Sequence, residues 1–218
     1  MKKRFIRAFA TLFYPNKCPF CSRVIAYDET SCAKCRSELS QFALKCFASG
    51  GYKCAARFMY SGVYSSAIKQ FKFGKKYGMA HSLGSHTADA VGMIFSDAEL
   101  AEIDCVTFVP MYLSRFSRGV NYAELIAKHV AELLGKPCEE LLIKSKRNRK
   151  QHSLNKIERR ENVRGVFSVK DPKKVRDRHI LIVDDIITTG NTLGECAKKL
   201  EKGGAAKVIC AAFCGSAS

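Results

Sequence analysis

The segment with the most evident chemistry runs from Ile180 to Leu193. A buried apolar run ends in two adjacent carboxylates, Asp184 and Asp185, and a loop of hydroxyl residues around Gly190 then opens a helix. Backbone N–H groups at such a helix start, helped by the helix dipole, make a cradle for a phosphate group. Two carboxylates beside this cradle suit the two vicinal hydroxyls of a ribose, with a hydrated Mg²⁺ nearby. The alternative is that the carboxylates only cap the following turn.

Paired cysteines form a second chemical pattern. Cys18-x-x-Cys21 and Cys32-x-x-Cys35 are separated by ten residues. This spacing is typical of a structural Zn²⁺ site, in which four thiolates close the coordination shell and leave no position for catalysis. Redox-active disulfides are the alternative. Cysteines in apolar strand or helix contexts are interpreted instead as small buried residues: Cys105, Cys196, Cys210 and Cys214.

Positive charge is concentrated in two blocks of the chain. The 218 residues carry 37 Lys plus Arg against 20 Asp plus Glu. Residues 1–58 hold 11 basic and 3 acidic side chains, and residues 144–178 hold 14 and 4. Blocks of this kind predict anionic partners such as phosphates or nucleic acid. Within the second block, residues 145–164 are long for a connection and predict either a lid or binding loop or a solvated basic helix.

Hydrophobic periodicity places these motifs on an α/β framework. Helices are expected over residues 65–73, 79–95, 121–134 and 192–202, and strands over 104–111, 141–144, 179–184 and 207–213. Alternating strands and helices predict a parallel sheet that is covered on both faces and binds ligands at the carboxyl ends of its strands.

The chain before this framework has a different composition. Residues 16–57 have few apolar runs, so a metal is expected to hold them together. We therefore predict an N-terminal module over residues 1–57, made of a helix and a cysteine zinc ribbon, followed by a domain over residues 58–218.

The first residues of the chain predict an amphipathic helix. Phe5, Phe9, Leu12 and Phe13 share one face at helical spacing. This face suits either docking on the protein's own core or a membrane surface. No segment reaches the roughly 18 to 20 apolar residues that cross a bilayer, and the thiolate pattern requires reducing conditions, so a cytoplasmic location is expected.

The acidic motif resembles the phosphoribosyl pyrophosphate (PRPP) binding motif of type I phosphoribosyltransferases. The resemblance extends over nearly the whole chain to the ComF family, also described as ComFC or GntX-like proteins. The matching pieces are Cys18-Pro-Phe-Cys21 with Cys32-Ala-Lys-Cys35, Tyr60-Ser-Gly62, Lys69-Gln-Phe-Lys72-Phe73, Val109-Pro110 with Arg115 and Arg118-Gly119-Val-Asn121, Gln151-His-Ser-Leu154, Arg159-Arg160-Glu-Asn162 and the Asp184 motif. The resemblance implies a zinc ribbon followed by a phosphoribosyltransferase-type domain, and a role in DNA uptake during competence.

Two positions depart from the family pattern. Relatives often carry a second set of paired cysteines, whereas this chain has only Cys46 and Cys54 there, without a second pair. The common Arg-Gly-Phe-Asn-Gln turn of the family is replaced by Arg118-Gly119-Val120-Asn121-Tyr122. The sequence of this chain therefore supports neither a second metal site nor the glutamine of that turn.

The predicted site combines the motif, the basic segment and the resemblance. Arginine and lysine side chains are expected to meet the charge that develops on a departing pyrophosphate. By resemblance, the basic segment corresponds to a flexible loop that closes over PRPP and excludes water. The predicted catalytic residues are Asp184, Asp185, Arg115 and Arg118; the predicted PRPP-binding residues are Asp184, Asp185, Ile186, Ile187, Thr188, Thr189, Gly190, Asn191, Thr192, Lys72, Lys146, Arg149 and Gln151; and the predicted zinc ligands are Cys18, Cys21, Cys32 and Cys35.

Two functions are compatible with these residues. One is an enzyme that uses Mg²⁺ and transfers a phosphoribosyl group from PRPP to an acceptor that the sequence does not name. The other is a non-catalytic competence protein that binds PRPP and single-stranded DNA, with a competence helicase as a further candidate partner. The basic blocks favour nucleic acid, but the basic segment has few aromatic residues on which bases could stack.

Overall fold

The computed structural model describes residues 16–26, 28–39, 41, 43–112, 119–145 and 165–216. Its centre is a five-stranded sheet with the order β1-β2-β7-β6-β3. The strands are β1 (Leu44–Ala48), β2 (Tyr52–Met59), β3 (Cys105–Phe108), β6 (His179–Ile187) and β7 (Lys207–Gly215). Strands β2, β7, β6 and β3 are parallel, and β1 pairs antiparallel with β2 at the edge. The expected α/β class with a parallel sheet is confirmed.

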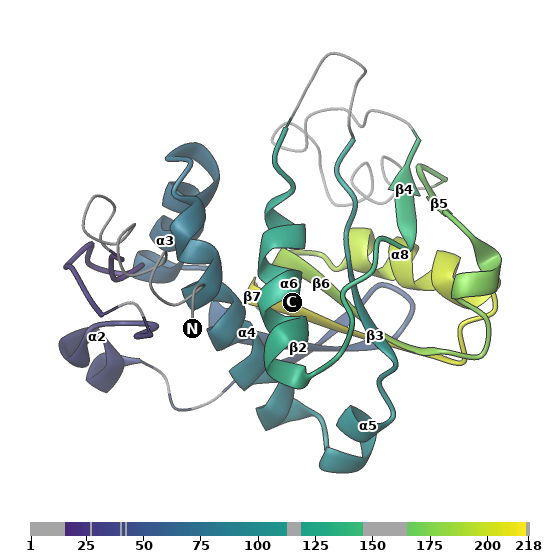
Figure 1. The fold of residues 1–218 in the computed structure, drawn as a ribbon, viewed down its shortest axis with the longest axis horizontal. Helices are drawn as coiled ribbons and strands as arrows, with labels where there is room; N and C mark the ends of the chain where they lie inside the picture. The colour runs from purple at the N-terminus through teal and green to yellow at the C-terminus, as the bar shows by residue number, and fades with distance from the viewer. Residues whose placement is uncertain are drawn as a thin grey trace, which may run out of the picture.

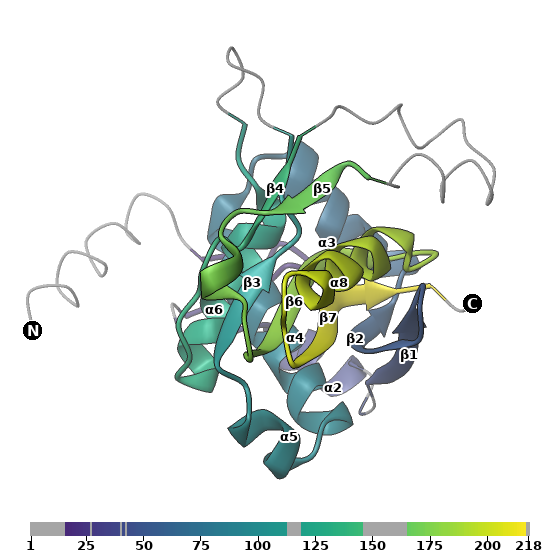
Figure 2. The same cartoon turned by 90° about the vertical axis from the view of Figure 1, so that its right-hand side faces the viewer.

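Helices cover both faces of this sheet. On one face lie α3 (Gly62–Phe73), α4 (Ala80–Ile94) and α6 (Tyr122–Leu134), and α8 (Asn191–Lys202) lies on the other. Figure 2 shows α8 in front of the sheet, with α4 and α6 behind it. Because residues of β6 alternate between the faces, Leu181 and Val183 join the core under α4 and α6, whereas Ile180 and Ile182 join the core under α8.

A smaller sheet extends from the main one. Strands β4 (Leu142–Lys144) and β5 (Phe167–Val169) pair antiparallel. The predicted basic segment between them, from residue 146 to 164, lies outside the described residues. The remaining short elements are α2 (Ala33–Glu38), α5 (Asp97–Ala101) and the 3₁₀ turns η1 (Tyr77–Met79) and η3 (Pro172–Lys174).

The cysteine-rich segment packs on the side of α3 and α4, at the left of Figure 1. The ring of Phe20 makes edge contacts with Phe58 and Tyr64, at centroid distances of 5.8 and 5.7 Å. The Ser82 hydroxyl of α4 donates a hydrogen bond to the carbonyl oxygen of Thr30. An aromatic side chain and a helix hydrogen bond therefore fix this segment against the domain.

Two predicted elements differ from the structure. The segment expected to depend on a metal, residues 16–57, instead contributes β1 and most of β2 to the main sheet, because β2 pairs in parallel with β7. Strand β6 was expected to end at Asp184, but its pairing continues to Ile187, which is opposite Gly215. The two carboxylates therefore lie within the strand.

Candidate functional site

The phosphate loop, residues 186–192, leads from the end of β6 into α8. Gly190 has a φ of +67° and is the N-cap of α8, in the left-handed conformation that favours glycine. No side chain among the described residues caps this helix. The first backbone N–H groups of α8 therefore have no partner within the helix and are available to an anion.

Ser216, the residue after β7, holds the phosphate loop through two hydrogen bonds. The backbone N–H of Ser216, just after β7, donates to the carbonyl oxygen of Ile187 at 2.8 Å. The Ser216 hydroxyl donates to the carbonyl oxygen of Thr188, also at 2.8 Å. These bonds use loop carbonyl groups, so they leave the loop N–H groups free to face a ligand.

The two carboxylates face opposite sides of the sheet, because successive residues of a strand alternate. Asp185 lies on the side of α3, where the ammonium group of Lys72 is 2.5 Å from its Oδ2. Burial alone would lower the pKa of Lys72, but the charges of Asp185 and Asp184 outweigh it and raise this pKa. Lys72 therefore carries its charge throughout the neutral range.

Asp184 lies on the side of α8 and β4. Its burial, followed by the charge of Asp185, raises the pKa of its carboxyl to about 7. The backbone N–H of Asp185 donates to Asp184 Oδ1 at 2.8 Å, and the charges of Lys72 and Lys144 oppose the rise. Burial lowers the pKa of Lys144, whose ammonium group is 5.4 Å from the ring centroid of Phe167. Each carboxylate therefore has a lysine on its own side of the sheet.

Helix packing positions Lys72. Ala67, Ile68 and Phe71 are buried on the core face of α3. The hydroxyl of Tyr122, on α6, donates to the carbonyl oxygen of Lys72. The helix is therefore fixed both along its length and at its last turn, which orients the lysine side chain toward β6.

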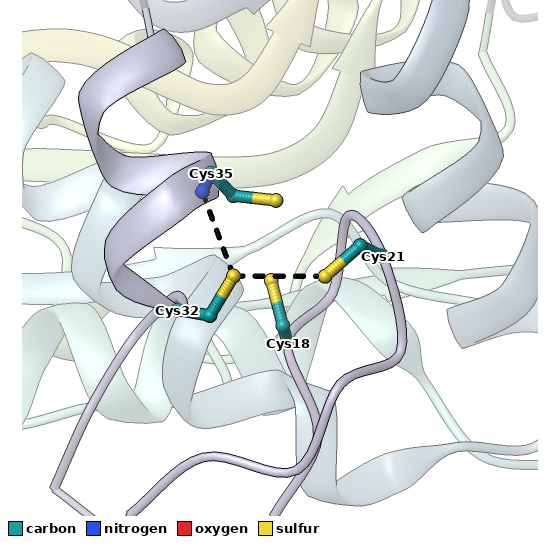
Figure 3. A group of neighbouring side chains, drawn as sticks. All are labelled: Cys18, Cys21, Cys32 and Cys35. Carbon is teal, nitrogen blue, oxygen red and sulfur yellow. Dashed lines mark hydrogen bonds between the residues drawn. The ribbon is translucent and has the colours of Figure 1, made fainter.

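Four thiols converge in the cysteine-rich segment. The Sγ atoms of Cys18, Cys21, Cys32 and Cys35 all lie within 4.8 Å of one another, and Figure 3 shows them around a common centre. Tetrahedral zinc with bonds of about 2.3 Å places its sulfurs about 3.8 Å apart, and the Cys21 and Cys32 sulfurs are 3.6 Å apart. The N–H of Cys35 contacts the Cys32 sulfur and lowers the pKa of that thiol to about 7. The residues fit a structural Zn²⁺.

The structure describes only part of the predicted site. It brings together Asp184, Asp185, Lys72 and the phosphate loop at the carboxyl ends of the parallel strands. Outside the described residues lie Arg115, Arg118, Lys146, Arg149 and Gln151. Sequence reasoning did not single out Ser216. The signal was present, since a hydroxyl residue after the last predicted strand falls at the same sheet edge as the acidic motif.

Two family models match the chain. Residues 9–60 match the double zinc ribbon domain, and residues 118–218 match the phosphoribosyl transferase domain. The DNA utilization protein YhgH of Escherichia coli strain K12 is 28% identical over 205 residues, which cover 88% of this chain and 86% of that protein. Competence protein F of Haemophilus influenzae is 29% identical over 185 residues, 81% of each chain. The chain therefore combines a double zinc ribbon region with a phosphoribosyl transferase domain, as the resemblance to the ComF family implies.

A solved structure is also similar to this chain. The glutamine PRPP amidotransferase from B. subtilis, complexed with ADP and GMP, is 24% identical with a TM-score of 0.39, and the match covers 60% of this chain and 25% of that one. Among the described residues, no helix is long and apolar enough to cross a membrane. The N-terminal residues 1–15, predicted to dock on the core or on a membrane, lie outside the described part.

The name of the ribbon family implies a second metal, which the described residues do not fit. Cys46 and Cys54 lie opposite each other on β1 and β2. A closed zinc shell needs four ligands, and this pair supplies two. Within the described residues, the thiols at Cys18, Cys21, Cys32 and Cys35 are the cysteine group that suits zinc.

We predict that purified protein contains one zinc ion per chain and that Cys32→Ser abolishes it. Removing one thiolate leaves an incomplete tetrahedral shell. Elemental analysis by inductively coupled plasma mass spectrometry measures the zinc content. The control is Cys138→Ser, a half-buried cysteine outside the group, which should keep its zinc. Two zinc ions per chain in the wild type would contradict the assignment.

We predict that Asp184→Asn stabilises the protein more at pH 8 than at pH 5. Folding raises the pKa of Asp184 to about 7, whereas an unfolded aspartate titrates near about 3.9. The folded state therefore retains a proton that the unfolded state has lost, so the free energy of unfolding falls as pH rises through this interval. Asparagine does not ionise, so the variant does not lose this part of its free energy of unfolding as the pH rises. Thermal unfolding at both pH values measures the effect.

The matched control for this variant is Asp97→Asn, an exposed aspartate in α5. Its change in melting temperature should be the same at pH 5 and pH 8. An equal gain for Asp184→Asn at the two pH values would show that the folded protein does not hold this proton.

Proposed function

We propose that this protein binds PRPP with Mg²⁺ and transfers the phosphoribosyl group to an acceptor. One observation carries the proposal: two adjacent carboxylates on strand β6 are followed, after a short loop, by a helix start without a side-chain cap. The helix start binds a phosphate group, and the two carboxylates bind a ribose next to it. The match of residues 118–218 to the phosphoribosyl transferase domain supports the same ligand.

The chain's own groups bind and orient the substrate. The N–H groups of the phosphate loop hold the 5′-phosphate, and the hydroxyls of Thr188, Thr189 and Thr192 add donors. Asp184 and Asp185 accept hydrogen bonds from the ribose hydroxyls. When bound with the substrate, Mg²⁺ supplies positive charge to the pyrophosphate oxygens.

The transfer step is electrostatic in character. The bond between ribose C1 and the pyrophosphate oxygen breaks, and pyrophosphate leaves with the electron pair. A nucleophilic atom of the acceptor forms the new bond to C1, and its proton passes to solvent water. The predicted basic residues Arg115, Arg118, Lys146 and Arg149 stabilise the leaving group in this proposal, and Gln151 contributes a further polar contact.

Lys72 also stabilises the leaving pyrophosphate in this proposal. In the structure its ammonium group neutralises Asp185. Ribose hydroxyls that bind Asp185 compete for the same carboxylate oxygens, so Lys72 becomes available to the negatively charged pyrophosphate. In this proposal, substrate binding exchanges the Lys72–Asp185 ion pair for an ion pair between Lys72 and pyrophosphate, and Asp185 gains hydrogen bonds from the ribose hydroxyls in place of the ammonium group.

A second candidate function is non-catalytic binding of PRPP and single-stranded DNA. The relatives are named a DNA utilization protein and a competence protein. In addition, residues 39–88 contain seven Lys and Arg and no Asp or Glu, and Lys69, Lys75 and Lys76 among them are exposed. Exposed basic side chains attract a phosphate backbone. A competence helicase would be the protein partner in this case.

We predict that PRPP with Mg²⁺ raises the melting temperature of the wild type, and that the double variant Asp184→Asn, Asp185→Asn loses this shift. A ligand that binds only the folded state stabilises it, by about 2.7 kcal/mol at a hundredfold excess over Kd. Differential scanning fluorimetry measures the shift, with Asp97→Asn as the control that keeps it. The site assignment is wrong when the wild type shows no shift.

Release of pyrophosphate in the presence of a panel of bases and nucleosides separates the two functions. Acceptor-dependent release from the wild type, absent in the double variant, establishes transfer. PRPP binding without release for any acceptor favours the second candidate.

For the second candidate, we predict that the double variant binds a fluorescent single-stranded oligonucleotide as tightly as the wild type does. The acidic pair contributes no phosphate contact, so its removal leaves the electrostatic attraction in place. Affinity should fall steeply as salt rises, because binding releases counterions. Fluorescence anisotropy at several salt concentrations measures both effects. Salt-independent binding, or none, would eliminate this function.

A further inference from the structure

The turn of the β1–β2 hairpin lies against the phosphate loop. The hairpin is formed by β1, β2 and the turn Ser49–Gly51, and Figure 2 shows it at the same side of the molecule as α8. The N–H of Ser49 donates to the carbonyl oxygen of Gly190 at 3.2 Å. The same oxygen accepts the N–H of Gly194 at 2.8 Å, the first hydrogen bond of α8. One carbonyl group thus joins the turn, the loop and the helix.

Two glycines allow this close approach. A Cβ atom on Gly190 would lie 2.7 Å from the Cα of Ala48, and one on Gly194 would lie 2.0 Å from the carbonyl oxygen of Ser49. The neighbouring atoms belong to the backbone, so they cannot turn aside as the end of a flexible side chain would. Gly194 lies within α8 and has no positive φ, so its backbone conformation does not require glycine. The close approach of the turn requires it instead.

The hairpin is itself firmly held in this position. The N–H of Gly51 donates to the carbonyl oxygen of Ala48 at 3.0 Å and closes the turn, in which Gly50 has a φ of +100°. The Tyr52 hydroxyl donates to Glu201 of α8 at 2.6 Å. The hairpin is therefore fixed to both ends of α8, by Ser49 of the turn and by Tyr52 of β2, and through β2 to the rest of the sheet.

We propose that the hairpin turn positions the phosphate loop for its ligand, with Gly194 as the positioning residue. The proposal rests on the function proposed above and adds an element to that site that the acidic motif does not contain. The turn contacts the loop at Gly190, where the N–H of Ser49 donates to its carbonyl oxygen. Its action is to fix the carbonyl of Gly190, so that the following N–H groups point in one direction before the ligand arrives.

The test is Gly194→Ala, read by isothermal titration with PRPP and Mg²⁺. The new Cβ must displace the turn, and we expect affinity to fall about ten- to a hundredfold, as misplaced contact groups cost in other sites. The matched control is Gly92→Ala on α4, where a Cβ meets no atom within 4 Å. Zinc content and helical circular dichroism should stay unchanged in both variants.

A second variant changes the hairpin turn instead of α8. Gly50→Ala strains the turn at its positive φ and places a Cβ 2.9 Å from the Tyr52 ring, without touching α8. We expect it to weaken PRPP binding as well. It also keeps the proposal testable if Gly194→Ala does not fold. Wild-type affinity in a folded Gly194→Ala or Gly50→Ala protein overturns the positioning role.

Amide hydrogen exchange separates this proposal from the proposed function. With no ligand present, exchange at residues 188–192 should be faster in both variants than in the wild type and in Gly92→Ala. A wild type that does not bind PRPP refutes the proposed function, while the exchange result still decides whether the turn orders the loop. Unchanged exchange in both variants overturns the inference.

Discussion

Two adjacent carboxylates on a buried strand cost free energy, because burial and mutual repulsion disfavour their charges. Much of this structure supplies the groups that offset this cost. Asp184 and Asp185 face opposite sides of the sheet, and each has a lysine on its side. Lys72 reaches Asp185 only because α3 is fixed on the core, and α3 also carries Tyr64, which contacts Phe20 between the first two zinc-ligand cysteines. The thiol cluster is therefore linked through one helix to the acidic pair.

The part of the site that could be predicted from the sequence is the part that is local in the chain. The acidic pair, Gly190 and the helix after it lie within a few residues, and the cysteine pairs have a spacing that zinc geometry explains. The partners of these groups could not be predicted, because they depend on packing. The resemblance placed Lys72 at the PRPP site, but nothing near Lys72 in the sequence indicates that its ion-pair partner is Asp185.

The same limit applies to the fold. Strongly apolar runs such as Ile180–Val183 predicted the central strands, since burial on both faces leaves a continuous pattern. Residues 44–57 contain cysteines and charges at positions that do not alternate clearly, so their place in the main sheet was missed. The parallel pairing of β2 with β7, which begins with Cys54 opposite Cys210, shows it. The ribbon region and the transferase domain thus share one sheet.

Strand order has a consequence for how the chain is made. Strand β7 follows every other described strand in the sequence, yet it lies between β2 and β6 in the sheet. The growing chain on the ribosome therefore exposes two unpaired strand edges until β7 has emerged. Such edges attract other chains. Synthesis that stalls before β7 leaves a chain prone to aggregation, however completely its zinc-binding segment has already folded.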